Sequence, residues 1–401
     1  MSFRNKIIAI LAAIVTAIPA ISFAASMTGT GDVYSYTYNG SRNREYKVYV
    51  PQSYSETQAV PMVVALHGCV MDHTDALNAW NWDLIADQNN VIIVFPFVTS
   101  FTEMRSENCW GYWFENHVTE NGGGEVDDVH GIAVEVESNY NIDPERRYIT
   151  GLSSGGAMTV ASAIAYNEYW AAAAPTAGLA YGDGSSSVTS ELFESVSFHV
   201  NKINAELDDT RPIPMMVVQS SNDEVVRITA GNLIRDSHLT AFGADTAVDS
   251  TEDCTAEGVS CTLKTYNDND GNVLVKTMFY NGAVAGTQSG SLGAGHYWGG
   301  DDGDSETWAW AKGPSYSQNI WAFFSDKTFS GIPPQCDTDN TAPATPTGLA
   351  VDEPHDKYAL LTINANTEED LKGYQVYNSN GEALTGVLNS TTLSVSGLIP
   401  Q

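Results

Sequence analysis

A serine surrounded by glycines is the first group in this 401-residue sequence that could do chemistry. Gly151, Leu152, Ser153, Ser154 and Gly155 follow the pattern Gly-X-Ser-X-Gly, in which a tight turn exposes a serine hydroxyl between a strand and a helix. The preceding "RYIT" is typical of a strand, and the following "GAMTVASAIAY" suits a helix. We therefore expect Ser153 to be a nucleophile; the alternative is a packing turn of small residues.

A serine hydroxyl needs a base to take its proton and a carboxylate to orient that base. In folds built around this turn, the chain order is serine, then carboxylate, then histidine. His296 lies in the Gly-rich "LGAGHYWGG", whereas His238 falls in a helical pattern and His355 in a separate C-terminal region. Asp223 closely follows the apolar run "MMVVQS". Ser153, Asp223 and His296 are the predicted catalytic triad.

Two of these assignments have alternatives. Glu224 is a second carboxylate directly after Asp223, and Asp223 itself is suited to capping a helix. His296 could be an ordinary histidine of a surface loop. We retain Asp223 because a carboxylate just past the end of a buried strand can orient an imidazole.

The tetrahedral intermediate of such a reaction needs two hydrogen-bond donors for its oxyanion. One should be the backbone N–H of Ser154, directly after the nucleophile. The other should be the backbone N–H of Cys69, in the loop after "MVVALHG".

The sequence contains five cysteines. Cys254 and Cys261 are close enough to close one loop with a disulfide, which leaves Cys69 to pair with Cys109 and leaves Cys336 over. A Cys69–Cys109 disulfide would also hold the oxyanion donor in place. Because no cysteines have CxxC spacing and His67 is the only histidine near them, we expect no metal site. We also expect no cofactor.

Aromatic residues cluster in the same predicted loops. Trp110 and Tyr112 lie in "CWGYWF", and Tyr297 and Trp298 directly follow His296. We expect these four aromatic side chains to contact substrate, with core packing as the ordinary alternative for such residues.

The segments that must position these groups alternate between two patterns. Short apolar runs, typical of strands buried on both faces, follow a hairpin at 33–38 and 44–50 and occupy residues 62–67, 91–96, 147–150, 170–177, 215–220 and 275–280. Helix-compatible stretches occupy residues 75–88, 126–139, 154–166, 226–240 and 315–325. The alternation predicts an α/β fold, with a mostly parallel sheet covered by helices on both faces. The acidic "NDNDGNV" at 267–273 lacks the first acid of an EF-hand loop, so a hairpin turn is favoured over a calcium site.

Composition changes near both ends of the chain. Residues 1–25 combine two basic residues, an apolar core and small terminal residues, as in a secretory signal peptide; a buried N-terminal helix is the alternative. We expect a catalytic domain at 26–330, a Pro- and Thr-rich linker at 331–345 and a small partial β-sandwich-like module at 346–401. The expected location is extracellular.

The formal net charge of −31 limits the partners of this protein. Such an excess of carboxylates repels nucleic acid and anionic membranes and favours neutral substrates. We expect no nucleic-acid or membrane partner, and a monomer.

Six stretches resemble, in order and spacing, the extracellular poly(3-hydroxybutyrate) depolymerase family of α/β-hydrolases, which also contains feruloyl and acetylxylan esterases. They are "VVALHGC", "NVIIVFP", "CWGYWF", "YNIDPERRYITGLSSGGAMT", "SSNDEVV" and "GAGHYWGG", and they span roughly residues 45–325. The resemblance implies an α/β-hydrolase fold, with Ser153, Asp223 and His296 as nucleophile, acid and base and Cys69 as an oxyanion donor.

Two positions depart from that family's pattern. Met71 stands where many members have Gln, which bears on how the oxyanion loop is held. Ser154 stands where Ala is common, without consequence for its N–H.

The tail from about residue 343 resembles the start of a fibronectin type III module, a spacer in polymer-degrading members. Because the chain stops at Gln401 inside that module, we expect it to be a fragment.

Together, these features predict a secreted serine esterase that hydrolyses an insoluble aliphatic polyester, such as poly(3-hydroxybutyrate), through an acyl-enzyme. The alternative enzyme cleaves feruloyl or acetyl esters on plant polysaccharide, and the spacer-like tail does not choose between these polymers. A noncatalytic adhesion protein on the same scaffold is the alternative from another class. The complete set of serine, aspartate and histidine argues against it.

Overall fold

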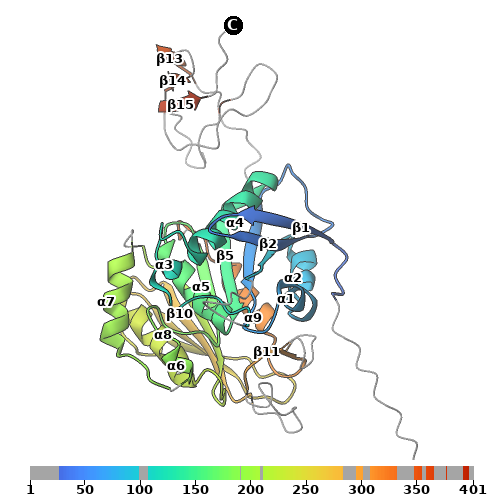
Figure 1. Ribbon diagram of the computed structural model, residues 1–401, viewed down its shortest axis with the longest axis vertical. Coiled ribbons are helices and arrows are strands. Elements are labelled where there is room, and N and C mark those ends of the chain that lie inside the picture. Colours follow the sequence, from blue (N-terminus) through green and yellow to red (C-terminus); the bar gives the residue numbers. More distant parts are fainter. Residues whose placement is uncertain are drawn as a thin grey trace, which may run out of the picture. The chain divides into compact units, whose positions relative to one another are not determined.

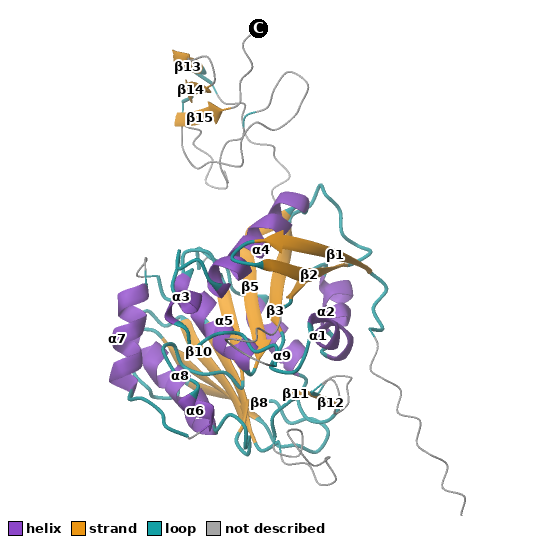
Figure 2. Cartoon of the chain, viewed as in Figure 1, coloured by secondary structure: helices purple, strands orange, loops and turns teal. Residues whose placement is uncertain are grey.

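The computed structural model describes residues 27–98, 107–189, 191–207, 211–282, 295–300, 308–331, 347–354, 358–364, 376 and 392–396. The chain forms two compact units, Met1–Pro334 and Gln335–Gln401. Figure 1 follows the chain from end to end, and Figure 2 marks its helices and strands.

A ten-stranded sheet forms the centre of the first unit, in the order β1-β2-β4-β3-β5-β6-β7-β10-β9-β8. From β4 to β10 neighbouring strands run parallel, whereas β1, β2, β8 and β9 extend the two edges with antiparallel pairs. The strands are β1 Asp32–Asn39, β2 Asn43–Val50, β3 Val60–Leu66, β4 Ile92–Pro96, β5 Ile142–Leu152, β6 Ala172–Thr176, β7 Met215–Ser220, β8 Ser250–Asp253, β9 Thr262–Asn267 and β10 Val273–Tyr280.

Helices cover both faces of this sheet. On one face α5 packs against β3, β5 and β6 and contacts α4 and α7; on the other, α1 contacts β3 and β4, and α9 contacts β6, β7 and α2. The described helices are α1 His73–Ala79, α2 Trp82–Asn89, α3 Glu115–Val118, α4 Glu125–Asn139, α5 Ser154–Ala165, α6 Ser186–Thr189, α7 Val196–Glu206, α8 Ile228–Ala241 and α9 Tyr316–Phe324. None of them has the length and apolar character needed to cross a bilayer.

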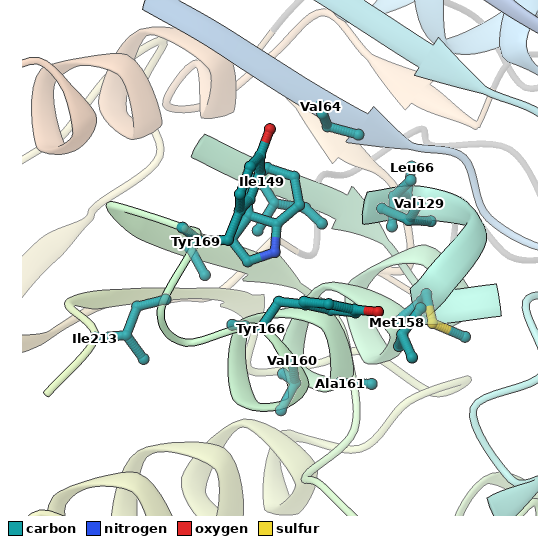
Figure 3. Close-up of a cluster of buried hydrophobic side chains, with 14 of the residues drawn as sticks. Val64, Leu66, Val129, Ile149, Met158, Val160, Ala161, Tyr166, Tyr169 and Ile213 are labelled. Atoms are coloured by element: carbon teal, nitrogen blue, oxygen red, sulfur yellow. The ribbon is translucent and has the colours of Figure 1, made fainter. Parts of the chain in front are cut away.

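The apolar runs are continuous because successive side chains enter two different cores. Val64 of β3 belongs to the cluster that contains α4 and α5, whereas its neighbour Val63 packs with α1, α2 and α9. Figure 3 shows part of the first cluster, to which β3 contributes Val64, β5 contributes Ile149 and α5 contributes Met158. Strands buried on both faces have no polar alternation, as the sequence pattern indicated.

The predicted α/β class, with a mostly parallel sheet and helices on both faces, is confirmed. The helix predicted at 75–88 is two helices instead, because Asn81 has a left-handed backbone that ends the first and begins the second. At 267–273 the chain makes the expected hairpin turn between β9 and β10, with Asp268 accepting the N–H groups of Asp270 and Asn272. Helix α7 and strand β8 were not predicted.

The described part of the second unit contains a three-stranded antiparallel sheet, β13 Ala350–Pro354, β14 Tyr358–Thr362 and β15 Thr392–Ser396. All three strands lie between residues 346 and 401, where β structure was predicted. The predicted signal peptide at 1–25, nearly all of the predicted linker at 331–345, Cys336 and His355 lie outside the described residues.

Substitution of Gly155 should be far more damaging than substitution of an unconstrained glycine. A Cβ on Gly155 would lie 2.2 Å from the carbonyl oxygen of Leu66 and 2.4 Å from that of His67, so Gly155→Ala should lower the free energy of unfolding by about 3 kcal/mol or more. A Cβ on Gly184 would lie 3.7 Å from Ser186 Oγ, and Gly184→Ala is the matched control. Urea denaturation measures both; similar small effects would contradict the close approach of α5 to β3.

Candidate active site

Ser153 occupies a sharp turn between the end of β5 and the start of α5. Its backbone has φ 58° and ψ −119°, a strained conformation for a residue with a side chain. The turn is held by the Ser153 N–H, which donates to the Thr176 oxygen at 2.9 Å, and by the Ser153 oxygen, which accepts from Ala157 N at 2.9 Å. A Cβ on Gly151 would lie only 2.6 Å from the Gly155 oxygen. The glycines of the motif therefore make the turn possible.

Asp223 and His296 form a buried hydrogen-bonded pair. Asp223 Oδ2 lies 2.8 Å from His296 Nδ1, and the side chains are 0% and 3% exposed. Asp223 Oδ1 accepts the N–H groups of Val225 and Val226, each at 2.8 Å. The two carboxylate oxygens therefore differ in role. Oδ1 fixes the carboxylate, whereas Oδ2 accepts a hydrogen bond from Nδ1–H of His296, which leaves Nε2 able to accept a proton. Glu224, the rival carboxylate, is exposed.

Ser153 and His296 line the same pocket, which has a volume of about 260 Å³. Most of its walls are apolar, and Trp308 places its ring edge-on to the His296 imidazole, with centroids 6.1 Å apart. The complete lining is Gly68, Cys69, Val70, Met71, Glu107, Tyr112, Leu152, Ser153, Ser154, Leu179, Val188, Val225, Val226, His296 and Trp308.

The two expected oxyanion donors belong to segments that meet at this pocket. Ser154 is the first residue of α5, and N–H groups of a first helical turn have no acceptor within their helix. Cys69 lines the pocket from the loop after β3 and is joined to Cys109 by a disulfide. Its neighbour Val70 has φ 59° and donates its N–H to the Glu107 oxygen at 2.6 Å. The disulfide and this hydrogen bond hold the loop after β3 in place, with Val70 in a backbone conformation that a β-branched residue rarely adopts.

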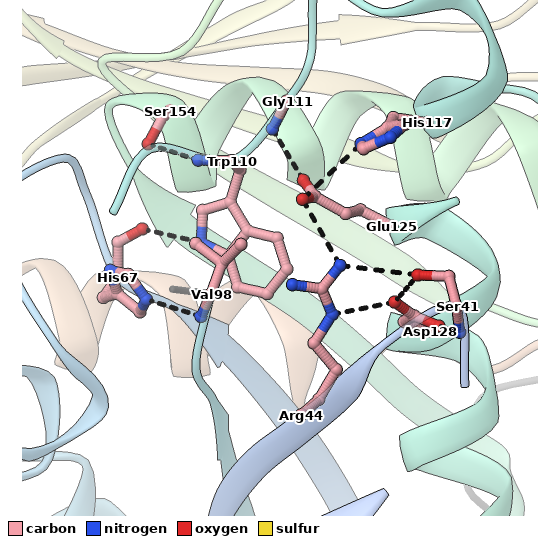
Figure 4. Close-up of polar contacts among 10 residues, drawn as sticks. All are labelled: Ser41, Arg44, His67, Val98, Trp110, Gly111, His117, Glu125, Asp128 and Ser154. Carbon is pink, nitrogen blue, oxygen red and sulfur yellow. Dashed lines mark hydrogen bonds and ion pairs between the residues drawn. The ribbon is translucent and has the colours of Figure 1, made fainter. Parts of the chain in front are cut away.

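His67, at the start of the same loop, is held by hydrogen bonds of its ring and of its carbonyl oxygen. Burial lowers the pKa of His67 to about 4, so the ring is neutral at ordinary pH. Its Nε2 accepts the Val98 N–H at 3.2 Å, and Nδ1 therefore carries the proton and donates to the Gly68 oxygen at 2.7 Å. The His67 carbonyl accepts Trp110 Nε1–H at 3.0 Å (Figure 4).

A buried charge network supports the loop that carries Cys109, Trp110 and Tyr112 (Figure 4). Glu125 Oε2 accepts the Gly111 N–H at 2.6 Å, and Glu125 Oε1 lies 3.4 Å from the Arg44 guanidinium. Arg44 also contacts Asp128 Oδ2 at 2.8 Å. These contacts tie the pocket wall to β2 and to the first turn of α4.

The four aromatic residues expected to contact substrate have different positions. Tyr112 lines the pocket. Trp110 is buried beneath it and donates its backbone N–H to Ser154 Oγ at 3.3 Å. The expectation of substrate contact is wrong for Trp110, Tyr297 and Trp298, because all three are buried and none of them lines the pocket. Trp298 stacks on Trp80 with ring centroids 4.2 Å apart, and the Tyr297 hydroxyl donates to the Gly282 oxygen.

Several residues of the pocket were not predicted from the sequence. Leu179, Val188 and Trp308 come from loops and a short helix with no periodic pattern. Val225 follows Asp223 so closely that its place could have been inferred from the triad. Both predicted disulfides, Cys69–Cys109 and Cys254–Cys261, are present.

Comparison with known proteins identifies a family and a fold. A family model described as Esterase PHB depolymerase matches residues 44–256. Poly(3-hydroxyalkanoate) depolymerase C of Paucimonas lemoignei is 30% identical over 237 residues, 57% of this chain and 55% of that protein. Feruloyl esterase B of Talaromyces funiculosus is 31% identical over 134 residues, 33% of this chain and 36% of that protein.

Among solved structures, an acetyl xylan esterase from Aspergillus awamori superimposes with a TM-score of 0.57 at 20% identity, covering 73% of this chain and 99% of that one. This likeness, with the observed sheet, confirms the α/β-hydrolase fold. The chain spans between about a third and about half of the length of these two curated relatives.

Removal of each of the two disulfides should lower the stability of the protein by a different amount. The Cys69–Cys109 bridge joins residues 40 apart in sequence, and the Cys254–Cys261 bridge joins residues 7 apart. From loop-closure entropy, replacing both cysteines by Ser should lower the free energy of unfolding by about 4 kcal/mol for the first pair and about 2 kcal/mol for the second. Urea denaturation of the two double variants measures this difference. A larger loss for the second pair would contradict the entropic account.

Proposed function

Because the chain belongs to the Esterase PHB depolymerase family, we propose that it is a serine-dependent carboxylic ester hydrolase that cleaves an aliphatic polyester such as poly(3-hydroxybutyrate). The observation that carries this proposal is the His296–Asp223 hydrogen bond beside a pocket that also contains Ser153. The sequence identity to a poly(3-hydroxyalkanoate) depolymerase supports this substrate class.

The first half of the proposed reaction transfers the acyl group to the enzyme. Ser153 Oγ attacks the ester carbonyl carbon while His296 Nε2 takes the hydroxyl proton. Asp223 accepts the hydrogen bond from Nδ1 and stabilises the imidazolium that forms. The ester C–O bond then breaks, His296 returns its proton to the leaving oxygen, and the alcohol end of the polymer departs.

The second half releases the acid. Water attacks the acyl-enzyme, His296 takes one of its protons, and the bond between the acyl carbon and Ser153 Oγ breaks as that oxygen recovers the proton. In both halves the backbone N–H groups of Ser154 and Cys69 stabilise the oxyanion. Every step uses groups of this chain and water.

The pocket walls favour a short, branched aliphatic acyl group. Leu179, Val188 and Val225 are apolar and line the same pocket as Ser153. Methyl groups of a polyester chain gain free energy from contact with such walls, because they leave water. The net charge of −31 is compatible with a neutral polymer.

A second candidate substrate is a feruloyl or acetyl ester on plant polysaccharide. It is supported by the similarity to a feruloyl esterase and to acetylxylan esterases. These matches cover shorter segments of the chain than the match to the depolymerase. We therefore place the polyester first.

We also propose that the protein is secreted and acts as a monomer on an insoluble ester-bearing polymer. Its two disulfides support an extracellular location, because disulfides persist in oxidising compartments. The division into 26–330, 331–345 and 346–401 and the fibronectin type III character of the tail remain proposals.

Ser153→Ala should abolish ester hydrolysis. Loss of the nucleophile should lower kcat on p-nitrophenyl butyrate by roughly 10⁴-fold or more and stop clearing of poly(3-hydroxybutyrate) films. Ser138→Ala is the control, because Ser138 is exposed on α4 and donates only to the Glu135 oxygen. Hydrolysis by the Ser153 variant at the wild-type rate would overturn the proposed mechanism.

The two candidate substrates can be separated by turnover. We expect kcat/KM on a hydroxybutyrate trimer ester to exceed that on methyl ferulate by about tenfold or more, since a misfit of a single methylene in an apolar pocket already costs about 1–3 kcal/mol in the transition state. The reverse order would favour the polysaccharide esterase.

A further inference from the structure

The hydroxyl of Ser154 makes a contact that the proposed mechanism does not require. That mechanism uses only the backbone N–H of Ser154, as an oxyanion donor. Ser154 is 3% exposed, and its Oγ accepts the Trp110 N–H at 3.3 Å (Figure 4). The side chain therefore connects the first residue of α5 to the loop that contains Trp110.

Trp110 also contacts the segment that carries the second proposed oxyanion donor. Its indole Nε1–H donates to the His67 oxygen at 3.0 Å. The preceding residue, Cys109, is joined by a disulfide to Cys69, whose N–H is that second donor in the proposed mechanism. Cys109 and Trp110 therefore form a bridge between the loop after β3 and the first residue of α5.

We propose that Ser154 is a positioning residue for ester hydrolysis, because its hydroxyl fixes the N–H of Ser154 relative to the N–H of Cys69 through Trp110. This inference rests on the proposed function, since it concerns the same oxyanion. Two donors stabilise an oxyanion best when both are already aimed at the place where the negative charge develops. Displacement of one donor therefore weakens stabilisation of the transition state more than binding of the neutral ester.

The backbone contacts of the turn at Ser153 do not include this bridge. Gly155 lies against the carbonyl oxygens of Leu66 and His67, and the Ser153 N–H donates to the Thr176 oxygen. These contacts hold the turn against β3 and β6 but do not involve the loop that contains Trp110. The Ser154 hydroxyl connects the turn to that loop.

The size of the effect is limited by the strength of this hydrogen bond. The 3.3 Å distance is long for a bond from an amide N–H, and both groups are neutral. Loss of such a bond changes an equilibrium constant by about tenfold at most. Deletion of a complete oxyanion donor lowers kcat by about 10²- to 10³-fold, so we expect a smaller loss from one displaced donor.

The test is Ser154→Ala, which removes the acceptor of the Trp110 N–H and keeps the backbone N–H at position 154. On p-nitrophenyl butyrate we expect kcat to fall by about threefold to tenfold and KM to stay within about twofold of wild type, because the lost interaction acts on the transition state. Butaneboronic acid adds to a serine Oγ as a tetrahedral analogue of the intermediate, and its affinity should fall by a similar factor. Rates are expressed per active site, counted from the burst of p-nitrophenol, so that partial unfolding does not imitate the effect.

Ser237→Ala is the matched control. Ser237 is a buried serine of α8 that does not line the pocket, and its hydroxyl donates within its own helix to the Leu233 oxygen at 2.6 Å. The control removes the same hydroxyl group, and both kcat and the affinity for butaneboronic acid should stay within about twofold of wild type. An equal loss of kcat in Ser237→Ala, or a wild-type kcat in Ser154→Ala, would overturn the positioning role.

A double-mutant cycle with Trp110→Phe distinguishes action through Trp110 from direct contact between the Ser154 hydroxyl and substrate. Trp110→Phe removes the indole N–H that donates to the His67 oxygen and keeps the backbone N–H. Within one bridge, the loss of kcat in the double variant should be smaller than the product of the two single losses by about twofold or more. A loss equal to that product would contradict the proposal. Failure of the wild type to hydrolyse the butyrate ester would instead refute the proposed function, so the two failures are distinguishable.

Discussion

Helix α5 can begin directly after Ser153 because no side chain separates Gly155 from the carbonyl oxygens of Leu66 and His67. This close approach joins the end of β5, the end of β3 and the first turn of α5 at one edge of the sheet. It also imposes a left-handed backbone on Ser153, whose cost must be offset by the surrounding packing. The loop after β3, Ser153 and the N-terminus of α5 are therefore positioned by one contact between backbones.

The pocket wall on the side of Tyr112 depends on a different interaction, the buried ion pair of Arg44 and Glu125. Both side chains are at most 2% exposed, and loss of one partner of such a pair typically costs about 3–5 kcal/mol. Glu125 also accepts the Gly111 N–H. The carboxylate that pairs with Arg44 therefore also holds the loop that contains Gly111. Stability of the edge strands and geometry of the pocket are thus coupled through Glu125.

The sequence was sufficient to locate the central strands and the turn at Ser153, because each follows a strong local rule. Continuous apolar runs marked strands buried on both faces, and the glycines marked the turn at Ser153. The positions of Trp298 and Tyr297 could not be inferred in the same way. Nearness to His296 in sequence does not fix the direction of a side chain, and Trp298 gains more by stacking on Trp80 than by lining an open pocket. Trp308 had no signal, since its place depends on loop geometry.

This contrast separates the chemistry of the site from its selectivity. The groups that would react, Ser153, Asp223 and His296, come from positions at or near the ends of β5 and β7 and from one Gly-rich loop. The groups that would contact the substrate, such as Leu179 and Trp308, come mainly from loops, which can change without disturbing the sheet. Relatives named for polyesters, feruloyl esters and acetylxylan are compatible with this division. The substrate preference of this chain should therefore depend on the loops around the pocket rather than on the sheet.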